Sequence, residues 1–190
     1  MTVRLSRKQA ALRKEIEDIS AAILMDHWNI SQYHAESRTT RLELIKRSLI
    51  HGNIVQKYTY VDECLAVIAC NHFFQRHVGE KTFSRLWKTE KFRAFNHYIM
   101  DDTYLLGKLR LVRALGEVPK AFRDYIEQLN ALRNAIAHSF FPENRRDYFG
   151  KGGLSYKGSN IYTLDGVRKL DEDFQQVRKY LAERAGEDLP

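Results

Sequence analysis

The sequence predicts an all-α protein, a helical bundle with one loop and small β-hairpin inserted before the last helix. Apolar residues recur at intervals of three and four along most of the chain, which is the spacing of one helix face. Helix breakers are few, with 10 glycines and 3 prolines, and most of them stand between these segments. One stretch near the end is polar, basic and glycine-rich instead, which indicates a loop.

Length and composition predict one globular domain over 1–190. Of the 190 residues, 44% are hydrophobic and 29% are charged, which provides apolar material for one sizeable core. We divide this domain into a helical body (1–141), a basic loop with a short hairpin (142–164) and a closing helix (165–185).

Hydropathy and charge bear on location and partners. No apolar run reaches the roughly 18 residues of a membrane span, and the charged N-terminus has no signal-peptide core. Cys64 and Cys70 lie in an apolar segment, as free buried cysteines do. We therefore expect a cytoplasmic protein. The formal net charge of +7 favours polyanionic partners, and by charge alone RNA, DNA and anionic membranes are all admissible.

The first half of the chain contains three predicted helices. The N-terminal helix begins at Ser6 and Gln9, which have the spacing of a capping box. The second, Thr40–Leu49, is amphipathic and is followed by a stop signal around Gly52. The third, Tyr58–His77, is apolar on most faces, which predicts a central position.

Two further helices are predicted before residue 116. Phe83–Met100 is rich in aromatic residues. Thr103–Leu115 follows, with Asp101 or Asp102 as its N-terminal cap and Gly116 as its stop.

The last third of the chain combines two helices and a hairpin. Pro119 begins the helix Lys120–Phe141, because proline is tolerated in the first turn of a helix, and a second proline at 142 ends it. Leu154–Leu164 is predicted to form a hairpin about residues 157–160. Asp165 then caps the closing helix. The apolar face of that helix consists of Val167, Leu170, Phe174, Val177 and Leu181.

The helix predicted at 120–141 carries an arginine on its apolar face. At about 100° per residue, Arg133 falls inside one apolar arc. The other members of the arc are Phe122, Ile126, Leu129, Ile136 and Phe140. An ionised guanidinium in apolar contact needs a carboxylate, a phosphate or a water-filled cleft, or it must snorkel outward. Arg133 therefore indicates a place where a partner is required.

Asn134 and His138 lie four residues apart on the polar stripe beside Arg133. Arginine grips a phosphate with paired hydrogen bonds, histidine exchanges protons near neutral pH, and asparagine orients either partner. Cleavage of a phosphodiester needs such a set. The alternative is structural: Arg133 and His138 cap carbonyls at the helix end or pair with Glu127 or Glu143.

The run from Arg133 to His138, R-N-A-I-A-H, resembles the signature of the HEPN family. That signature is arginine, four to six residues, then histidine, often with a polar residue directly after the arginine, and Asn134 fills the polar position. Two other arginine and histidine pairs, at 47/51 and 93/97, are one residue too short. The resemblance covers six residues by motif and the helical body by architecture.

The resemblance implies a HEPN-like homodimer in which the two motif helices face one another across a composite cleft. In catalytic members the activity is metal-independent RNA cleavage, in which the 2′-hydroxyl attacks the adjacent phosphate, and no cofactor is expected. By that carry-over, His138 acts as general acid or base and Arg133 stabilises the phosphorane charge. Asn134 positions these groups. The expected partners are a second copy and an RNA substrate, with no membrane partner.

The resemblance also implies a role as a toxin or phage-defence effector, with a cognate antitoxin or regulatory protein as a further candidate partner. In HEPN toxins paired with a nucleotidyltransferase antitoxin, a tyrosine often stands two residues after the histidine, and here that position is Phe140. Modification by that route is therefore not expected at this position, although Tyr148 lies not far beyond it. The other function implied is a non-catalytic HEPN-type module that binds RNA or a protein.

The loop after this helix is a second candidate RNA contact. Arg145, Arg146, Tyr148 and Lys151 combine positive charge with an aromatic ring, which suits backbone contact and stacking with single-stranded RNA. The same character extends to Phe149, Tyr156 and Lys157. A solvated basic loop is the alternative.

No metal site is predicted. Cys64, Cys70, His72 and His77 are of metal-ligating types, but they lie within one predicted helix with no turn to bring them together.

Overall fold

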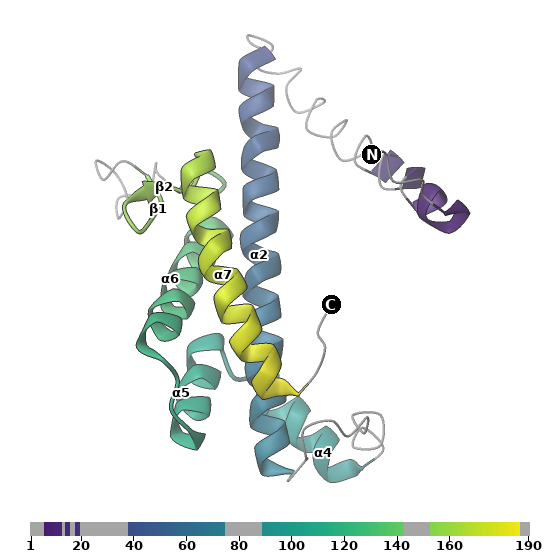
Figure 1. Cartoon of the computed structure of the whole chain (residues 1–190), viewed down its shortest axis with the longest axis vertical. Coiled ribbons are helices and arrows are strands. Elements are labelled where there is room, and N and C mark those ends of the chain that lie inside the picture. The colour runs from purple at the N-terminus through teal and green to yellow at the C-terminus, as the bar shows by residue number, and fades with distance from the viewer. Residues whose placement is uncertain are drawn as a thin grey trace. The chain divides into compact units, whose positions relative to one another are not determined.

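The computed structural model describes residues 6–12, 14–15, 18–19, 38–74, 89–142 and 153–186 (Figure 1). The chain divides into two units, Met1–Leu49 and Ile50–Pro190, and each is described by itself. The described part is mostly helical, with one antiparallel hairpin before the last helix, so the predicted all-α class is confirmed. The single domain over 1–190 stays a prediction. No described helix has the length and apolarity that a membrane crossing requires.

The capping box at the N-terminus is confirmed. The Ser6 backbone N–H donates to Gln9 Oε1 at 2.9 Å, and the Gln9 backbone N–H donates to Ser6 Oγ at 3.3 Å. Described residues between 7 and 19 are helical. The remainder of that predicted helix lies outside the described residues.

Helix α2 (Arg38–Phe73) is continuous, so the predicted stop around Gly52 is wrong. Gly52 is exposed, and a Cβ built there meets nothing within 4 Å. A glycine inside a helix costs about 1 kcal/mol relative to alanine. Burial of Ile54 and of the apolar residues that follow it outweighs that cost.

The core of the unit Ile50–Pro190 lies between α2, α5 (Leu105–Leu115), α6 (Lys120–His138) and α7 (Leu164–Ala185). Its largest fully buried aliphatic side chains are Ile54, Leu65, Leu105, Ile126, Leu129, Ile161, Leu170 and Leu181. Figure 1 shows α7 running alongside α2. Two polar contacts, Lys57 to Asp171 at 2.7 Å and the Asn71 amide to the Ala185 carbonyl at 2.8 Å, show that the two helices run parallel.

A second buried cluster lies where α4 (Glu90–Phe95) continues into the π-helix η2 (Asn96–Met100). Phe92 and Met100 pack there against Ala69 and Cys70 of α2. The predicted helix from residue 83 is thus confirmed from residue 90 onward, and residues 83–88 lie outside the described residues.

The start of α5 differs from the prediction. Tyr104 occupies the N-cap position and makes no side-chain capping bond, so neither Asp101 nor Asp102 caps the helix. Asp101 instead belongs to the preceding turn, where its carboxylate accepts a hydrogen bond from the Asn96 amide at 3.4 Å. The end of α5 at Leu115, before Gly116, agrees with the prediction.

Helix α6 is shorter than predicted. It begins after Pro119, as expected, but ends at His138 rather than at residue 141. Ser139 is extended, and its Oγ accepts a hydrogen bond from the Phe141 backbone N–H at 3.2 Å, which turns the chain away from the helix axis. His138 is therefore the last helical residue.

The predicted hairpin is confirmed. Strands β1 (Ser155–Tyr156) and β2 (Ser159–Asn160) are antiparallel. The turn residues Lys157 and Gly158 have φ values of 46° and 78°, as a tight turn of two residues with left-handed backbone requires. Tyr156 and Ile161 are buried, so the hairpin contributes to the core.

The cap of α7 is Thr163, not Asp165. Thr163 Oγ1 accepts a hydrogen bond from the Gly166 backbone N–H at 3.2 Å and donates to the Asn160 carbonyl at 2.6 Å. Asp165 lies in the first turn, with its carboxylate bonded to Ser159. The apolar face agrees with the prediction: Leu170, Phe174, Val177 and Leu181 are buried, and Val167 is half-buried.

Candidate active site

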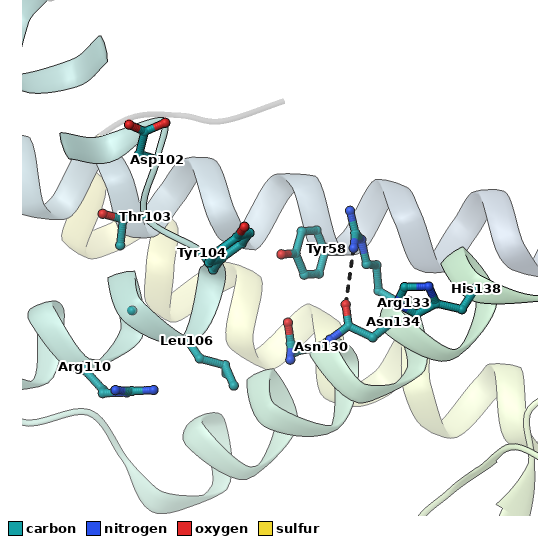
Figure 2. A pocket seen from close by; sticks show the side chains of 11 residues that line it. Tyr58, Asp102, Thr103, Tyr104, Leu106, Arg110, Asn130, Arg133, Asn134 and His138 are labelled. Atoms are coloured by element: carbon teal, nitrogen blue, oxygen red, sulfur yellow. Dashed lines mark hydrogen bonds between the residues drawn. The ribbon is translucent and has the colours of Figure 1, made fainter. Parts of the chain in front are cut away.

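An open cleft of about 810 Å³ lies between α2, α6 and the first turns of α5 (Figure 2). One end is formed by the last two turns of α6, which carry Arg133, Asn134 and His138. The other end is formed by the loop before α5 and by Arg110 of that helix. The three residues predicted as catalytic thus line one cleft together, while their catalytic roles stay predictions.

Arg133 has an aromatic partner. The guanidinium carbon lies 5.0 Å from the centroid of the Tyr58 ring of α2, within the range of a cation–π interaction. Nη1 donates a hydrogen bond to Asn134 Oδ1 at 3.2 Å. Among the described residues, no carboxylate forms an ion pair with Arg133. The ring and the amide hold the guanidinium in place and leave its other donors available to a ligand.

The apolar arc predicted for α6 needs correction near its C-terminal end. The residues of α6 that are buried are Tyr125, Ile126, Leu129, Leu132 and Ala135. Ile136 is only half-buried, and Phe140 is 36% exposed and lies beyond the helix end. Because the buried face gives way to the cleft at this level, Arg133 lies at its border and not inside a closed apolar contact.

His138 is exposed at the C-terminal end of α6. Figure 2 shows its side chain on the same side of α6 as Arg133. Within the described ranges, His138 has no hydrogen-bond partner, and neither it nor Arg133 pairs with Glu127. The structural alternative based on Glu127 is therefore not observed, and Glu143 lies outside the described residues.

Tyr58 was not found by sequence reasoning, because it precedes Arg133 by 75 residues and lies on another helix. Burial and the nearby Asp62 carboxylate raise the pKa of Tyr58, while Arg133 and a backbone hydrogen bond with Leu105 oppose the shift. Tyr58 therefore stays protonated at neutral pH. Asp62 itself pairs with the buried Lys108 at 2.6 Å, so its charge is already matched.

Several polar side chains on the cleft wall lack partners elsewhere in the described chain. Among them are Arg110, Asn130 and His138, of which Asn130 is half-buried. Asn130 lies four residues before Asn134 on the polar stripe of α6. Arg110 was not predicted, because no local pattern links α5 to α6. With Arg133, the cleft has two permanent positive charges against one lining carboxylate, Asp102. This balance suits an anionic ligand.

Most of the predicted basic loop lies outside the described residues. Arg145, Arg146, Tyr148 and Lys151 lie outside the described residues. Tyr156, however, is fully buried and its hydroxyl donates to Asp173, so the predicted stacking role of this ring is wrong. Because the Tyr156 ring is part of the core, it cannot stack on a base of RNA. The neighbouring Lys157 pairs with the same carboxylate at 2.6 Å.

In the described part of the chain, no three histidine, cysteine, aspartate or glutamate side chains lie close enough together to hold a metal ion. Cys64 and Cys70 are buried free thiols, and burial raises the pKa of Cys70 to about 11. His77 lies outside the described residues.

Comparison of the chain with protein-family models, with curated proteins and with solved structures finds no match. A functional assignment therefore has to come from the cleft. Its distinguishing features are an excess of positive charge and a set of polar side chains without partners in the described chain.

Proposed function

We propose that the protein is an endoribonuclease of the HEPN type, which cleaves RNA at this cleft without a metal ion. The observation that carries this proposal is the convergence of Arg133, Asn134 and His138 at one end of an open, positively charged cleft. Arginine and histidine side by side can bind a phosphate and move a proton, which are the two demands of phosphodiester cleavage.

In the proposed reaction, the 2′-oxygen of the ribose forms a bond to the adjacent phosphorus and the bond from phosphorus to the 5′-oxygen breaks. A general base accepts the 2′-hydroxyl proton, and a general acid donates a proton to the leaving 5′-oxygen. The products are a 2′,3′-cyclic phosphate and a 5′-hydroxyl. His138 moves a proton, and Arg133 stabilises the charge on the phosphorane oxygens. Asn134 orients Arg133 through the 3.2 Å hydrogen bond.

A homodimer is part of the proposal. Two copies of His138 facing one another provide one base and one acid, whereas a single histidine has to change role during the reaction. The chain directly after α6 supports an interface, because Phe140 and Phe141 are 36% and 40% exposed there. Light scattering on the purified protein at micromolar concentration is expected to give twice the chain mass of 22.3 kDa.

We place this activity in a toxin or phage-defence effector that is held in check by an antitoxin or another regulatory protein. The position of the modified tyrosine in related toxins is Phe140, whose ring packs against His51 with centroids 5.3 Å apart. Control by modification of that residue is therefore not part of the proposal. The loop with Arg145, Arg146, Tyr148 and Lys151 is proposed to extend the RNA contact.

The same cleft also supports a second function, that of a non-catalytic module that binds RNA or a protein. One observation favours it: His138 has no orienting hydrogen bond from the described residues, whereas catalytic histidines are commonly held by a second group. In that case Arg133 and its neighbours bind phosphate and no bond is broken.

Incubation with total RNA in EDTA at pH 6 to 8 distinguishes these functions. We expect the wild type to cleave RNA. His138→Ala should be slower by about 10²- to 10⁴-fold, as for loss of a general acid or base. Arg133→Ala should be slower by about 10²- to 10³-fold, as for loss of a donor that stabilises charge in the transition state. His97→Ala and Arg113→Ala are matched controls, because both residues are exposed and neither lines the cleft. They should cleave like the wild type.

Binding of 2′-O-methyl RNA, which lacks the attacking hydroxyl, completes the test. Intact RNA in all samples together with tight binding that needs Arg133 would establish the non-catalytic module. Intact RNA without such binding would rule out both the endoribonuclease and the RNA-binding module.

A further inference from the structure

The cleft is larger than the proposed catalytic end requires. Its volume of about 810 Å³ falls within the roughly 300–1,000 Å³ of sites that enclose whole ligands. Arg133, Asn134 and His138 account for only the end formed by α6 (Figure 2). The end formed by α5 and the loop before it has side chains of its own that the proposed reaction does not use.

Arg110 is the first of these side chains. It is exposed on the cleft wall, and no ion pair or hydrogen bond to it is found in the described residues. A guanidinium in this position can bind a phosphate with two parallel hydrogen bonds. Between Arg110 and Arg133 lies Asn130, a half-buried amide that likewise has no partner in the described chain.

Tyr104 is the second side chain at this end of the cleft that the proposed reaction does not use. The residue is 86% exposed, although it stands at the N-cap of a well-packed helix. The side chain makes no capping bond and packs on no other ring among the described residues. The fold therefore does not use this ring, while an exposed aromatic beside a cationic groove is the arrangement that stacks the bases of single-stranded RNA.

We propose that Tyr104 and Arg110 form a second nucleotide subsite in the same cleft. Single-stranded RNA with one phosphate at Arg133 then places a neighbouring base on the Tyr104 ring and a neighbouring phosphate at Arg110. This inference rests on the proposed function, because it takes RNA as the ligand of the cleft. It makes a single nucleotide a poor ligand and a short oligonucleotide a good one.

Asp102 sets the chemistry of the base at this subsite. It is the one carboxylate on the cleft wall in the described chain, and it lies at the same end as Tyr104. A carboxylate repels phosphate but accepts hydrogen bonds from the amino group of a base. The base on Tyr104 is therefore expected to carry an amino group, which cytosine, adenine and guanine have and uracil lacks.

The test uses the full-length chain and ligands that cannot be cleaved. A fluorescent 2′-O-methyl hexanucleotide is bound, then displaced by cytidine 3′-monophosphate or by unlabelled 2′-O-methyl oligonucleotides of two, four and six residues. For the hexanucleotide, Tyr104→Ala is expected to weaken binding by roughly 5- to 100-fold, the usual effect of losing a stacking platform. Tyr104→Phe keeps the ring and is expected to bind like the wild type.

Arg110→Gln is expected to weaken hexanucleotide binding and to reduce the slope of log K against log salt by about 0.7, the value for one phosphate contact to a single strand. Asp102→Asn removes a charge of opposite sign at the same end, so it should strengthen binding of a uridine hexanucleotide. Neither variant should change the binding of cytidine 3′-monophosphate by more than about twofold. All three side chains are exposed and lack partners in the described chain, so the variants should fold.

Hexanucleotide binding that is lost with Arg133→Ala but stays within twofold of the wild type for Tyr104→Ala and Arg110→Gln would overturn the subsite and leave the proposed function standing. Absence of any hexanucleotide binding by the wild type would overturn both. For the uridine hexanucleotide, weakening by Asp102→Asn equal to that by Arg110→Gln would also overturn the subsite, because removal of a negative charge and removal of a positive charge would then have the same effect.

Discussion

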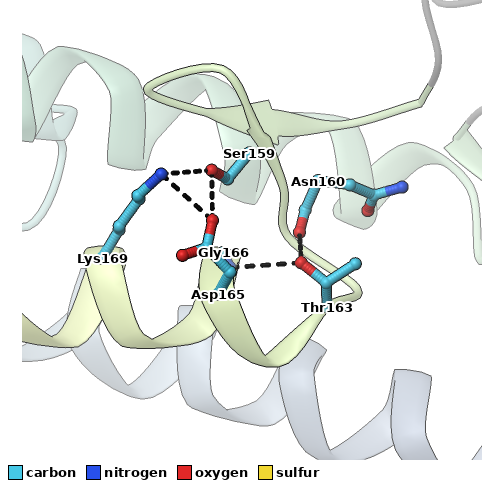
Figure 3. Close-up of polar contacts among 6 residues, drawn as sticks. All are labelled: Ser159, Asn160, Thr163, Asp165, Gly166 and Lys169. Carbon is cyan, nitrogen blue, oxygen red and sulfur yellow. Dashed lines mark hydrogen bonds and ion pairs between the residues drawn. The ribbon is translucent and has the colours of Figure 1, made fainter.

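Two polar clusters of this protein differ in how their hydrogen bonds are satisfied. Where the hairpin meets α7, the polar side chains bond to one another (Figure 3). Ser159 Oγ donates to Asp165 and accepts from Lys169, both at 2.6 Å, and Thr163 bonds to backbone on both sides. In the cleft, by contrast, Arg110, Asn130 and His138 have no partner among the described residues.

The difference separates a structural role from a functional one. Polar groups that satisfy each other stabilise one arrangement of the chain, whereas a half-buried polar group without a partner, such as Asn130, loses contact with water and gains nothing from the fold. Such groups persist where a ligand supplies the missing bonds. Substitutions in the cleft are therefore expected to leave the stability of the protein unchanged. Substitutions at the junction of the hairpin with α7 are expected to lower it.

The largest effect on stability is expected at Gly166, on the junction side of this comparison. A Cβ at this position would lie 2.1 Å from the Asn160 carbonyl oxygen and 2.9 Å from the Ile161 Cα. Because these are backbone atoms, Gly166→Ala must displace the hairpin from α7. We expect a loss of about 1–3 kcal/mol in the free energy of unfolding, measured by urea denaturation.

Gly52→Ala on α2 is the matched control, since Gly52 is also helical but a Cβ there meets nothing within 4 Å. It should raise the free energy of unfolding by about 0.5–1 kcal/mol. Equal effects of the two substitutions would show that the close approach at Gly166 does not matter.

A smaller effect is expected from Tyr58, on the cleft side. Tyr58→Leu removes the ring under Arg133 and should weaken binding of a 2′-O-methyl hexanucleotide by roughly 2- to 30-fold, the range of a cation–π contribution. Tyr58→Phe keeps the ring and should bind like the wild type.

The double variant Tyr58→Leu with Arg133→Ala separates positioning from packing. If Tyr58 acts through Arg133, the tyrosine substitution has no further effect once the arginine is gone. Additive losses in the double variant would argue that Tyr58 contributes to the cleft independently of Arg133.

The smallest effect is expected at Asp165, again in the junction. A hydrogen bond from Ser159 and then one from Lys169 lower the pKa of Asp165 below its ordinary value of 3.8. A carboxyl with a lowered pKa in the folded state stabilises the protein above that ordinary value, and this contribution is lost as the pH falls through the lower, folded pKa.

Asp165→Asn should therefore be slightly less stable than the wild type at pH 6, and the gap should close at pH values below 3.8. Urea denaturation of both proteins at a series of pH values measures this difference in the free energy of unfolding. In a Ser159→Ala background the difference at pH 6 should shrink, and an unchanged difference would show that Ser159 is not its main cause.

Local patterns in the sequence determined the elements that depend on neighbouring residues. The capping box at Ser6, the two-residue turn at Gly158 and the apolar face of α7 all rest on interactions between residues close in sequence. Such patterns failed at Gly52, because burial of Ile54 and of the apolar residues that follow it outweighs the weak local preference for a break. They failed at Asp165 because Thr163 also fits the cap.

The candidate site shows the same division. The sequence by itself predicted that Asn134 and His138 share a face, because they lie four residues apart on one helix, and that Arg133 flanks them at the same helix end. Only the tertiary structure decided that Tyr58 lies under the arginine and that Arg110 lines the opposite end of the cleft. These residues come from helices that are distant in sequence, and it is packing of the core, not any local spacing, that brings their side chains to one cleft.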